Sequence, residues 1–358
     1  MKIGIIHGFV GGGGGTEKTL DAILESLTSA GHQVTLYTIS KPSTSFPNVK
    51  TVSTLSFHLP AFGLYQRYME SKLVEKAKNN DLVIQASGGL AVPVDKNQKL
   101  VIYCHHDFQN ETKRDTSKYK GIWSWYYKPY YALSKKFLNH ISDKNIFLIS
   151  NSKFIHDSIK EKFSKDSKII YPPVETQPFQ KNTQKTNSAI TISRYSQEKN
   201  LEFAVDVFSD IDIDYTIVGN TKTRLNQIYF EKLSAQVKNP KTHLLQNIPR
   251  HQVIENLQSS KIYFHASPET FGISVVESIA AGCIPIVPDN SAHKETVPFE
   301  QLRYKQDNKQ DAKDKIKKAL AGDYDKFIPL LQSSLENYDK STFKSTFAGA
   351  IQEISSTG

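Results

Sequence analysis

Two glutamates and a glycine in one short stretch of this 358-residue chain could bind a ligand that carries both phosphate and hydroxyl groups. Glu269 and Glu277 lie eight positions apart, and Gly272 lies between them, just before a helix expected to begin near Ser274. Backbone N–H groups at a helix start favour an anion, and carboxylates accept hydrogen bonds from hydroxyl groups. A sugar nucleotide offers both kinds of group. The alternative is a βαβ unit whose acidic residues merely lie at loop ends.

A pair of cations precedes this stretch in the chain. Arg194 and Lys199 follow an expected strand at 188–193 and precede an expected helix at 201–208. A planar guanidinium and a compact ammonium could together hold a diphosphate and stabilise the negative charge that grows on it as a glycosyl bond breaks. Taken alone, the two residues could equally be surface cations in a loop.

Five consecutive glycines, 11–15, lie between the first expected strand, 2–7, and the first expected helix, 16–30. Glycine lets the backbone approach a ligand closely and present N–H groups to it, so Gly13, Gly14 and Gly15 are candidate binding positions. The next strand lacks the acidic end that a nicotinamide dinucleotide site uses, and the loop lacks the Gly-Lys-Ser/Thr ending of a Walker loop. A surface turn is the alternative.

His105 directly follows another expected strand, 100–104. In open parallel sheets, ligands bind outside the carboxyl ends of the strands, and this end should therefore face a cleft. A lone histidine is more often structural, and the neighbouring His106 leaves the choice between the two open.

Asp210-Ile-Asp-Ile-Asp214 contains two overlapping D-x-D patterns. Such a pattern can hold a divalent metal against a diphosphate. Here it lies between an expected helix and the strand at 215–218, which favours a solvated connection. We expect no metal and no other cofactor, because Arg194 and Lys199 already supply the positive charge.

The elements that must position these residues form two series in which strands and helices alternate. This alternation predicts parallel sheets with helices on both faces. We therefore predict an α/β protein of two doubly wound, Rossmann-like domains, residues 1–175 and 176–340, with a cleft between them. The last helix, about 340–358, should pack back on the first domain. The expected strands are 2–7, 33–39, 81–85, 100–104 and 146–149, then 188–193, 215–218, 242–245, 261–265 and 284–287.

The positive charge is concentrated in the first half of the chain. Of the net charge of +9, residues 1–175 carry +8, from 23 Lys and Arg against 15 Asp and Glu. This asymmetry indicates an anionic partner, either nucleic acid or a membrane surface, unless the lysines are simply solvated. Segment 120–138 mixes Trp, Tyr and Lys, which is typical of a membrane–water boundary, but a core helix whose aromatic side chains pack inside fits as well. RNA binding fits less well, because no recognisable RNA-binding module surrounds the segment. Segment 57–68 could be a second apolar element. We expect an anionic membrane surface and no nucleic acid.

Nothing in the sequence predicts a membrane-spanning helix or a cleaved leader, since every apolar run is only of strand length. Cys104 and Cys283 fit no metal-ligand spacing and are expected to be reduced thiols in core strands. We therefore expect a cytoplasmic protein, peripheral on the cytosolic face of a membrane.

With these residues assembled, the chain resembles the family-4 retaining glycosyltransferases, which have the GT-B fold. The stretch from Glu269 to Gly282 resembles the E-x7-E signature of that family, Arg194 and Lys199 match its R-x4-K pattern, and 11–17 is similar to its Gly-Gly-Gly-Glu region. Within the family, the chain looks most like the α-1,2-mannosyltransferases that extend dolichol-linked oligosaccharides. It departs from them at 289–293, where relatives usually have a Gly-Gly-Pro type of turn, and in lacking an N-terminal membrane anchor.

This resemblance implies roles for individual residues. Arg194 and Lys199 would stabilise the leaving diphosphate, Glu269 would bind hydroxyls of the donor sugar and Glu277 those of the ribose. His105 would lie near the anomeric centre, and the catalytic set would be His105, Arg194, Lys199 and Glu269. The donor-binding set would be Gly13, Gly14, Gly15, Arg194, Lys199, Glu269, Phe271, Gly272, Ile273 and Glu277.

The implied reaction is the retaining transfer of a hexose from a nucleotide-sugar donor, with mannose from GDP-mannose the best match, to a lipid-linked oligosaccharide or glycolipid acceptor. Three alternatives remain at this point. A UDP-sugar-dependent transferase would differ in donor, a GT-B sugar-nucleotide epimerase would need no acceptor, and a nucleotide or nucleic-acid binder would show affinity without turnover.

Overall fold

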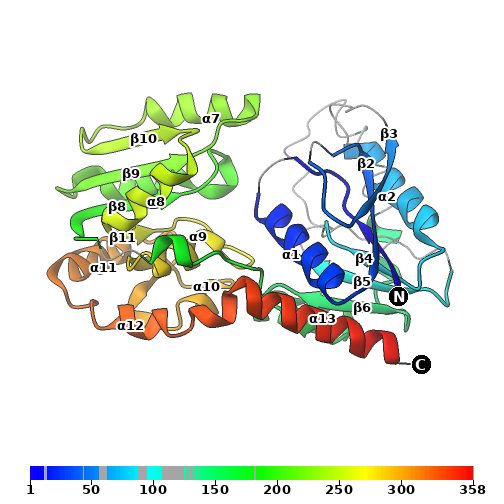
Figure 1. Ribbon diagram of the computed structural model, residues 1–358. Coiled ribbons are helices and arrows are strands. Elements are labelled where there is room, and N and C mark those ends of the chain that lie inside the picture. The colour runs from blue at the N-terminus through cyan, green and yellow to red at the C-terminus, as the bar shows by residue number, and fades with distance from the viewer. Residues whose placement is uncertain are drawn as a thin grey trace. The chain divides into compact units, whose positions relative to one another are not determined.

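The computed structural model describes residues 1–11, 14–42, 44–55, 63–87, 95–106, 138–180 and 183–357, with positions 125, 128, 132 and 134–136. It divides into two compact units (Figure 1). The N-terminal unit comprises residues 1–173 and 340–358, and the C-terminal unit comprises 174–339. The division lies two residues from the expected boundary at 175, and the last helix belongs to the N-terminal unit.

The N-terminal unit is built on a parallel sheet with the strand order β3-β2-β1-β4-β5-β6-β7. Its first strand pairs with β2 on one side and β4 on the other, so the chain winds outward in both directions from β1. The strands are β1 (Lys2–Ile6), β2 (Gln33–Ser40), β3 (Lys50–Leu55), β4 (Leu82–Gln85), β5 (Lys99–Cys104), β6 (Ile146–Ser150) and β7 (Lys168–Ile169).

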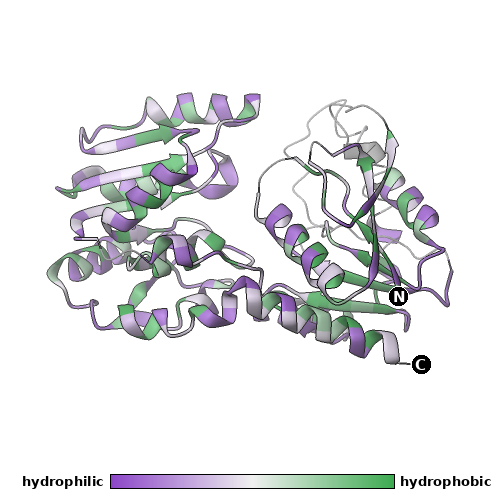
Figure 2. Cartoon of the chain, viewed as in Figure 1, coloured by the Kyte–Doolittle hydropathy of each residue, from purple (hydrophilic) through white to green (hydrophobic). Residues whose placement is uncertain are grey.

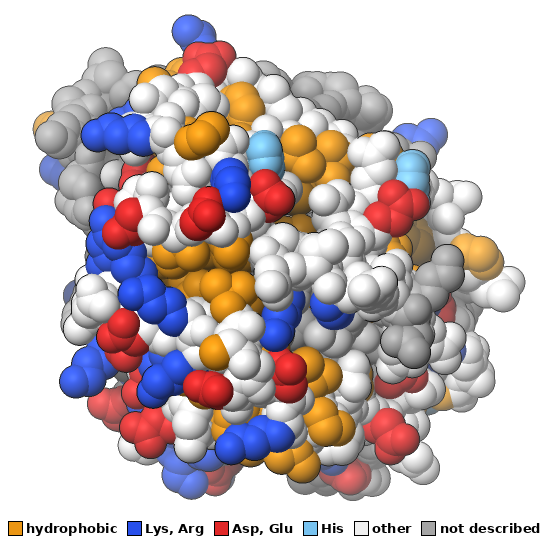
Figure 3. All heavy atoms as spheres, turned by 90° about the vertical axis from the view of Figure 1, so that its left-hand side faces the viewer, with side chains coloured by type: hydrophobic (Ala, Val, Ile, Leu, Met, Phe, Trp, Pro, Cys, Tyr) orange, Lys and Arg blue, Asp and Glu red, His pale blue; other side chains and the backbone are white. Residues whose placement is uncertain are grey.

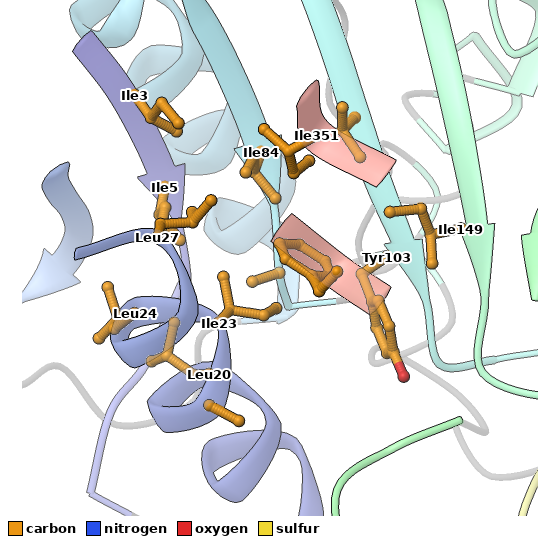
Figure 4. Packing of buried hydrophobic residues seen from close by; sticks show 14 of the residues in the cluster. Ile3, Ile5, Leu20, Ile23, Leu24, Leu27, Ile84, Tyr103, Ile149 and Ile351 are labelled. Atoms are coloured by element: carbon orange, nitrogen blue, oxygen red, sulfur yellow. The ribbon is translucent and has the colours of Figure 1, made fainter. Parts of the chain in front are cut away.

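The helices of this unit cover the sheet with apolar faces. They are α1 (Gly15–Ser29), α2 (Gly63–Ala77), α5 (Lys153–Phe163) and α13 (Lys340–Ser356). The face of α1 that carries Leu20, Ile23, Leu24 and Leu27 is buried, and Figure 4 shows these side chains in one cluster with residues of β1, β4 and α13. The Ser26 hydroxyl donates to the Lys344 carbonyl at 2.6 Å, and Lys340 pairs with Glu25 at 2.7 Å, which holds α13 against α1.

The C-terminal unit holds a second parallel sheet with the order β10-β9-β8-β11-β12-β13. Figure 2 shows hydrophobic residues concentrated on the strands, whereas the helices alternate between hydrophobic and hydrophilic residues. This is the two-sheet α/β architecture that the sequence predicts. The strands are β8 (Thr186–Ile192), β9 (Asp214–Gly219), β10 (Thr242–Gln246), β11 (Ser260–Phe264), β12 (Ile284–Pro288) and β13 (Arg303–Tyr304). The helices are α6 (Leu201–Val207), α7 (Arg224–Ser234), α8 (Arg250–Ser259), α9 (Ile273–Ala280), α10 (His293–Thr296), α11 (Lys309–Ala321) and α12 (Phe327–Gln332), with the short 3-10 helix η3 (Gln197–Lys199) after β8.

A glycine at the end of β9 allows the loop after β8 to pack closely. A Cβ atom added to Gly219 would lie 2.2 Å from the Ser193 carbonyl oxygen and 2.9 Å from the Tyr195 ring. The segment that leads to Arg194 and η3 therefore keeps its position only if residue 219 has no side chain.

We expect Gly219→Ala to lower the free energy of unfolding by about 2 kcal/mol, because the methyl group forces backbone apart. Gly349→Ala is the control, and we expect this substitution to raise the free energy of unfolding. No atom lies within 4 Å of the site of its Cβ, and alanine favours the helix by up to about 1 kcal/mol. Urea denaturation of both variants measures the difference. Equal stability of the two variants would contradict the close approach at Gly219.

Candidate active site

The carboxyl ends of β8, β11 and β12 carry the residues that the sequence singles out in the C-terminal unit. Helix η3 follows β8, the loop 265–272 follows β11, and α10 begins soon after β12. Because these strands are parallel neighbours, the three connections meet at one edge of the sheet. This edge brings together residues that are far apart in the chain.

Lys199 and Glu269, 70 residues apart, form the centre of the site. The Lys199 ammonium lies 2.5 Å from Oε1 of Glu269, and Nε2 of His265 lies 3.0 Å from the same oxygen. The two paired side chains are only 16% and 21% exposed. The Glu269 N–H donates to the Ser291 hydroxyl at 3.0 Å, so the backbone is held as well. The structure thus brings together two residues of the expected catalytic set.

The surroundings keep the Glu269 carboxylate ionised. Burial raises its pKa, but the hydrogen bond from His265 and the positive charge of Lys199 lower it by more. The pKa therefore lies well below the usual value for glutamate. A permanently ionised carboxylate only accepts hydrogen bonds, which suits it to bind hydroxyl groups and not to donate a proton.

This depressed pKa should be visible as a pH dependence of stability. A carboxyl whose pKa is lower in the folded state stabilises the fold above its unfolded pKa of about 4.3, and this contribution is lost as pH falls below that value. The free energy of unfolding of wild type should therefore approach that of Glu269→Gln as pH falls from about 5 to about 3. Urea denaturation across this range tests the prediction, and a difference that stays constant would contradict it.

Sequence reasoning missed His265 and His293, which surround Glu269. His293, at the start of α10, packs edge-to-face on the His265 ring with centroids 5.2 Å apart, and its Nε2 atom donates to the Ser267 carbonyl at 3.0 Å. Since a carbonyl oxygen only accepts, Nε2 of His293 carries the proton. Burial lowers the pKa of His293 to about 3, so its ring is neutral. The departure from the expected turn at 289–293 therefore places a neutral histidine behind the site.

Glu277, the second of the two glutamates, interacts with other residues than Glu269 does. Its side chain is only 5% exposed, and Arg250 binds both carboxylate oxygens, at 2.5 and 3.4 Å. The guanidinium carbon lies 5.0 Å above the Phe179 ring, and the Arg250 side chain is 45% exposed. Sequence reasoning missed Arg250, which begins α8 and whose only signal was a positive charge after Pro249.

The start of α9 provides the expected anion-binding geometry. Gly272 caps the helix with φ of +90°, a conformation that other residues rarely adopt, and its carbonyl accepts from Val275 and Val276. The first N–H groups of a helix, here from Ile273 and Ser274, have no partner within it. The side chain of Phe271 is buried and packs edge-to-face on Tyr338, with ring centroids 5.4 Å apart. Its expected role in donor binding stays a prediction.

Arg194 is not drawn into the Lys199–Glu269 cluster. Its side chain is 59% exposed and lies 3.5 Å from Oε1 of Glu198. Of the two predicted cations, Lys199 therefore lies in a largely buried ion pair, whereas Arg194, a few residues away in the chain, is exposed. The diphosphate-binding role that we predict for Arg194 stays a prediction.

In the N-terminal unit, His105 is buried at the carboxyl end of β5. Its Nε2 atom donates to the Ala86 carbonyl at 3.0 Å, and its ring lies 4.8 Å from Tyr103. Burial and the neighbouring His106 lower its pKa to about 3, so the ring is neutral. His7, after β1, is also buried, and burial lowers its pKa to about 4. Sequence reasoning missed His7.

The glycine loop is attached to α1 through an acidic side chain. The Gly11 N–H lies 2.5 Å from Oε1 of Glu17 in the first turn of the helix. Gly14 caps α1, Gly15 is its first residue, and no atom lies within 4 Å of the site of a Gly14 Cβ. Gly13 lies outside the described residues.

The acidic run at 210–214 contains two ion pairs with lysines and one contact with a histidine ring. Asp210 pairs with Lys313 at 2.5 Å, Asp212 with Lys241 at 2.7 Å, and Asp214 lies 3.5 Å from His243. Figure 3 shows such acidic and basic side chains interspersed on one face of the molecule. In the described part of the chain, no cluster of three or more His, Cys, Asp or Glu residues could hold a metal.

Most of the two segments that we expected at a membrane, 57–68 and 120–138, lies outside the described residues. Of the second segment, Trp125 is exposed, with the Lys128 ammonium 4.6 Å from its ring. Among the described helices, none combines the length and the apolar character needed to cross a membrane. Cys104 and Cys283 are buried free thiols.

The fold and site define an α/β protein of two parallel-sheet units whose C-terminal unit has a helix start and two glutamates at the carboxyl edge of its sheet. A family model described as "Glycosyl transferases group 1" matches residues 173–338, and one described as "Glycosyltransferase Family 4" matches residues 13–178. The two matches together span nearly the whole chain. The chain therefore belongs to the family-4 glycosyltransferases of the GT-B fold.

Individual relatives are distant. The chain is 25% identical to "Alpha-1,3/1,6-mannosyltransferase ALG2" of Candida glabrata, over 99% of this chain and 89% of that protein. It is 25% identical to the "GDP-Man:Man(3)GlcNAc(2)-PP-Dol alpha-1,2-mannosyltransferase" of the same yeast, over 54% of this chain and 44% of that protein. Among solved structures, Anabaena Alr3699/HepE in complex with UDP and glucose superposes with a TM-score of 0.73 at 13% identity, over 98% of this chain and 99% of the other. That likeness supports the fold.

Proposed function

We propose that the protein is a retaining mannosyltransferase that uses GDP-mannose and extends a lipid-linked oligosaccharide. The observation that carries the proposal is the Lys199–Glu269–His265 cluster beside the start of α9. It combines a carboxylate for sugar hydroxyls with a cation and free helix N–H groups for a diphosphate. The mannosyltransferase names of the two yeast relatives support mannose as the sugar.

The Glu269 carboxylate has capacity left for a sugar. Both side-chain contacts described for it, to Lys199 and His265, are made at Oε1. In the described structure this leaves Oε2 to accept from hydroxyl groups of the donor. Lys199 uses one of its three N–H donors here, and the others can bind a phosphate oxygen.

The leaving diphosphate is the group that needs stabilisation as the glycosyl bond breaks. Lys199 and the exposed Arg194 supply positive charge, and the N–H groups of Ile273 and Ser274 supply hydrogen-bond donors. We propose that the reaction uses no metal, because these groups can neutralise the diphosphate. Glu277, fixed by Arg250, would accept hydrogen bonds from the ribose.

We further propose that the acceptor lies at an anionic membrane surface and is not a nucleic acid. The basic charge of residues 1–175 supports an anionic partner, and a lipid-linked acceptor would place the enzyme at a bilayer. Binding to vesicles that contain phosphatidylserine, compared with vesicles of phosphatidylcholine alone, tests this part separately.

A donor and acceptor panel tests the proposed activity. GDP-mannose, GDP-glucose, UDP-glucose and UDP-N-acetylglucosamine are each assayed for hydrolysis, for transfer to mannosylated lipid diphosphates and for transfer to RNA, with and without EDTA. We expect GDP-mannose to be turned over to an α-linked product, at a rate that EDTA does not change. Preference for a UDP-sugar overturns the donor, free sugar without any acceptor points to an epimerase-like enzyme, and nucleotide binding without turnover points to a binding protein.

A further inference from the structure

His7, in the N-terminal unit, has polar atoms that the folded chain leaves without partners. It directly follows β1 and is only 4% exposed. Within the described structure, neither Nδ1 nor Nε2 of its ring has a hydrogen-bond partner. Burial lowers the pKa of the ring to about 4 and outweighs the Glu17 carboxylate and the Phe9 backbone, which raise it. The ring is therefore neutral, with one N–H to donate and one lone pair to accept.

An unpaired polar ring in the interior lowers the stability of the fold. A buried donor or acceptor loses its hydrogen bonds to water, so native proteins pair nearly all such groups. An apolar side chain at position 7 would avoid this loss, as Ile3 and Ile5 of the same strand do. Departures of this kind from the rules of stability are typical of functional sites.

His105 lies near His7 on the same face of the sheet. Side chains alternate along a strand, and Ile5 and Tyr103, each two positions earlier, belong to one buried cluster (Figure 4). Strand β4 lies between β1 and β5, and Ala86, directly after β4, places only a methyl group between the two histidines. Two strand spacings are about 10 Å. His7 also contributes to the lowered pKa of His105.

The two rings together suit hydroxyl groups better than phosphate. Nε2 of His105 donates to the Ala86 carbonyl at 3.0 Å, so Nδ1 of this neutral ring is an acceptor. The pair thus offers one N–H from His7, two lone pairs and no positive charge. A hydroxyl group both donates and accepts, whereas a fully ionised phosphate only accepts. A sugar carries several hydroxyl groups and can therefore use both rings.

We propose that His7, beside His105, binds hydroxyl groups of the acceptor sugar. The proposed partners of the donor lie in the C-terminal unit, which leaves this pair for the second substrate of the transfer. Six of the eight residues after His7, 8–15, are glycine. Glycine backbone adopts many conformations, which lets the segment move so that a ligand reaches the ring. This inference deepens the proposed function and rests on it.

The first test is kinetic and uses transfer from GDP-mannose to a mannosylated lipid diphosphate. His7→Leu should raise the KM for the acceptor by about tenfold, because a sugar hydroxyl loses its partners. Hydrolysis of GDP-mannose without acceptor and the Kd of GDP should stay within about twofold. His7→Asn and His7→Gln place a carboxamide near the positions of Nδ1 and Nε2, and the better of the two should stay within about threefold of wild type.

Thermal stability separates a binding role from a packing role. His7→Leu should raise the Tm by about 3 °C although transfer becomes weaker, because the variant removes unpaired polar atoms. Thr242→Val is the matched control. Thr242, on β10 of the other unit, also has a buried hydroxyl without a partner in the part of the chain that the structure describes. Its variant should raise the Tm and leave the acceptor KM within about twofold.

Three results of these measurements would overturn the inference. A lower Tm of His7→Leu would mean that the ring has a partner within the protein. An acceptor KM within about threefold of wild type would leave a bound water as the partner of the ring. A change in donor affinity in place of the acceptor KM would assign His7 to the donor.

A binding test separates this inference from the proposed activity. In protein labelled with 15N-histidine, methyl α-mannoside should shift the ring resonances that His7→Leu removes, whereas sodium phosphate should not. A shift with phosphate alone, or no shift with the sugar, overturns the inference. A shift with methyl α-mannoside in a protein that turns over no GDP-sugar overturns the proposed function and leaves His7 as a sugar-binding residue.

Discussion

Glu269→Gln should lower the kcat of GDP-mannose turnover by about 100- to 1000-fold with little change in the Kd of GDP. The side chain keeps its size but loses the charge that the sugar hydroxyls and Lys199 recognise, and groups that stabilise a transition state typically contribute this much. Steady-state kinetics with calorimetric GDP binding measures both quantities.

Glutamine is the right replacement because Lys199 and Glu269 are largely buried together. Alanine would leave the Lys199 charge with no partner in a poorly solvated place, and loss of stability would obscure the effect on activity. Asp214→Asn is the control, an equal change of charge at an exposed position of the same unit. Loss of GDP affinity in place of kcat would assign Glu269 to the nucleotide and contradict the proposed role.

Arg250→Met should raise the KM for GDP-mannose by about 30-fold and change kcat much less. Glu277 would lose its bidentate partner, and its carboxylate would no longer be held for the ribose. We also expect the free energy of unfolding to fall by about 2 kcal/mol, because a buried carboxylate loses hydrogen bonds to a charged donor.

Arg224→Met serves as the control for Arg250, since Arg224 begins α7 as Arg250 begins α8 and is exposed. A double-mutant cycle of Arg250→Met with Glu277→Gln adds a second check. If Arg250 acts only through Glu277, the double variant should bind GDP-mannose no worse than the single variant that binds it more weakly. A drop in kcat at unchanged KM would place Arg250 at the reacting sugar and contradict its assignment to the ribose side.

The strand predictions were correct where the sequence carries a strong local signal. Buried central strands such as β5 and β11 are continuous apolar runs, and both were expected within about one residue of their observed ends. The edge strand β3 was missed, because its sequence Lys-Thr-Val-Ser-Thr-Leu is polar and its side chains are mostly half-exposed. The sequence places the start of β8 at 188, two residues late, because Thr186 and Asn187 are polar and give no apolar signal.

The sequence by itself determined the family, the two parallel sheets and the candidates Lys199, Glu269 and Glu277, because each depends on spacing within one βα unit. Only the tertiary structure decided which residues meet. It pairs Lys199 with Glu269, Glu277 with Arg250, and His265 with both Tyr263 and Glu269. It also leaves Arg194 exposed. The physical reason is that parallel strands bring distant connections to one edge of the sheet, whereas sequence patterns report on neighbours along the chain.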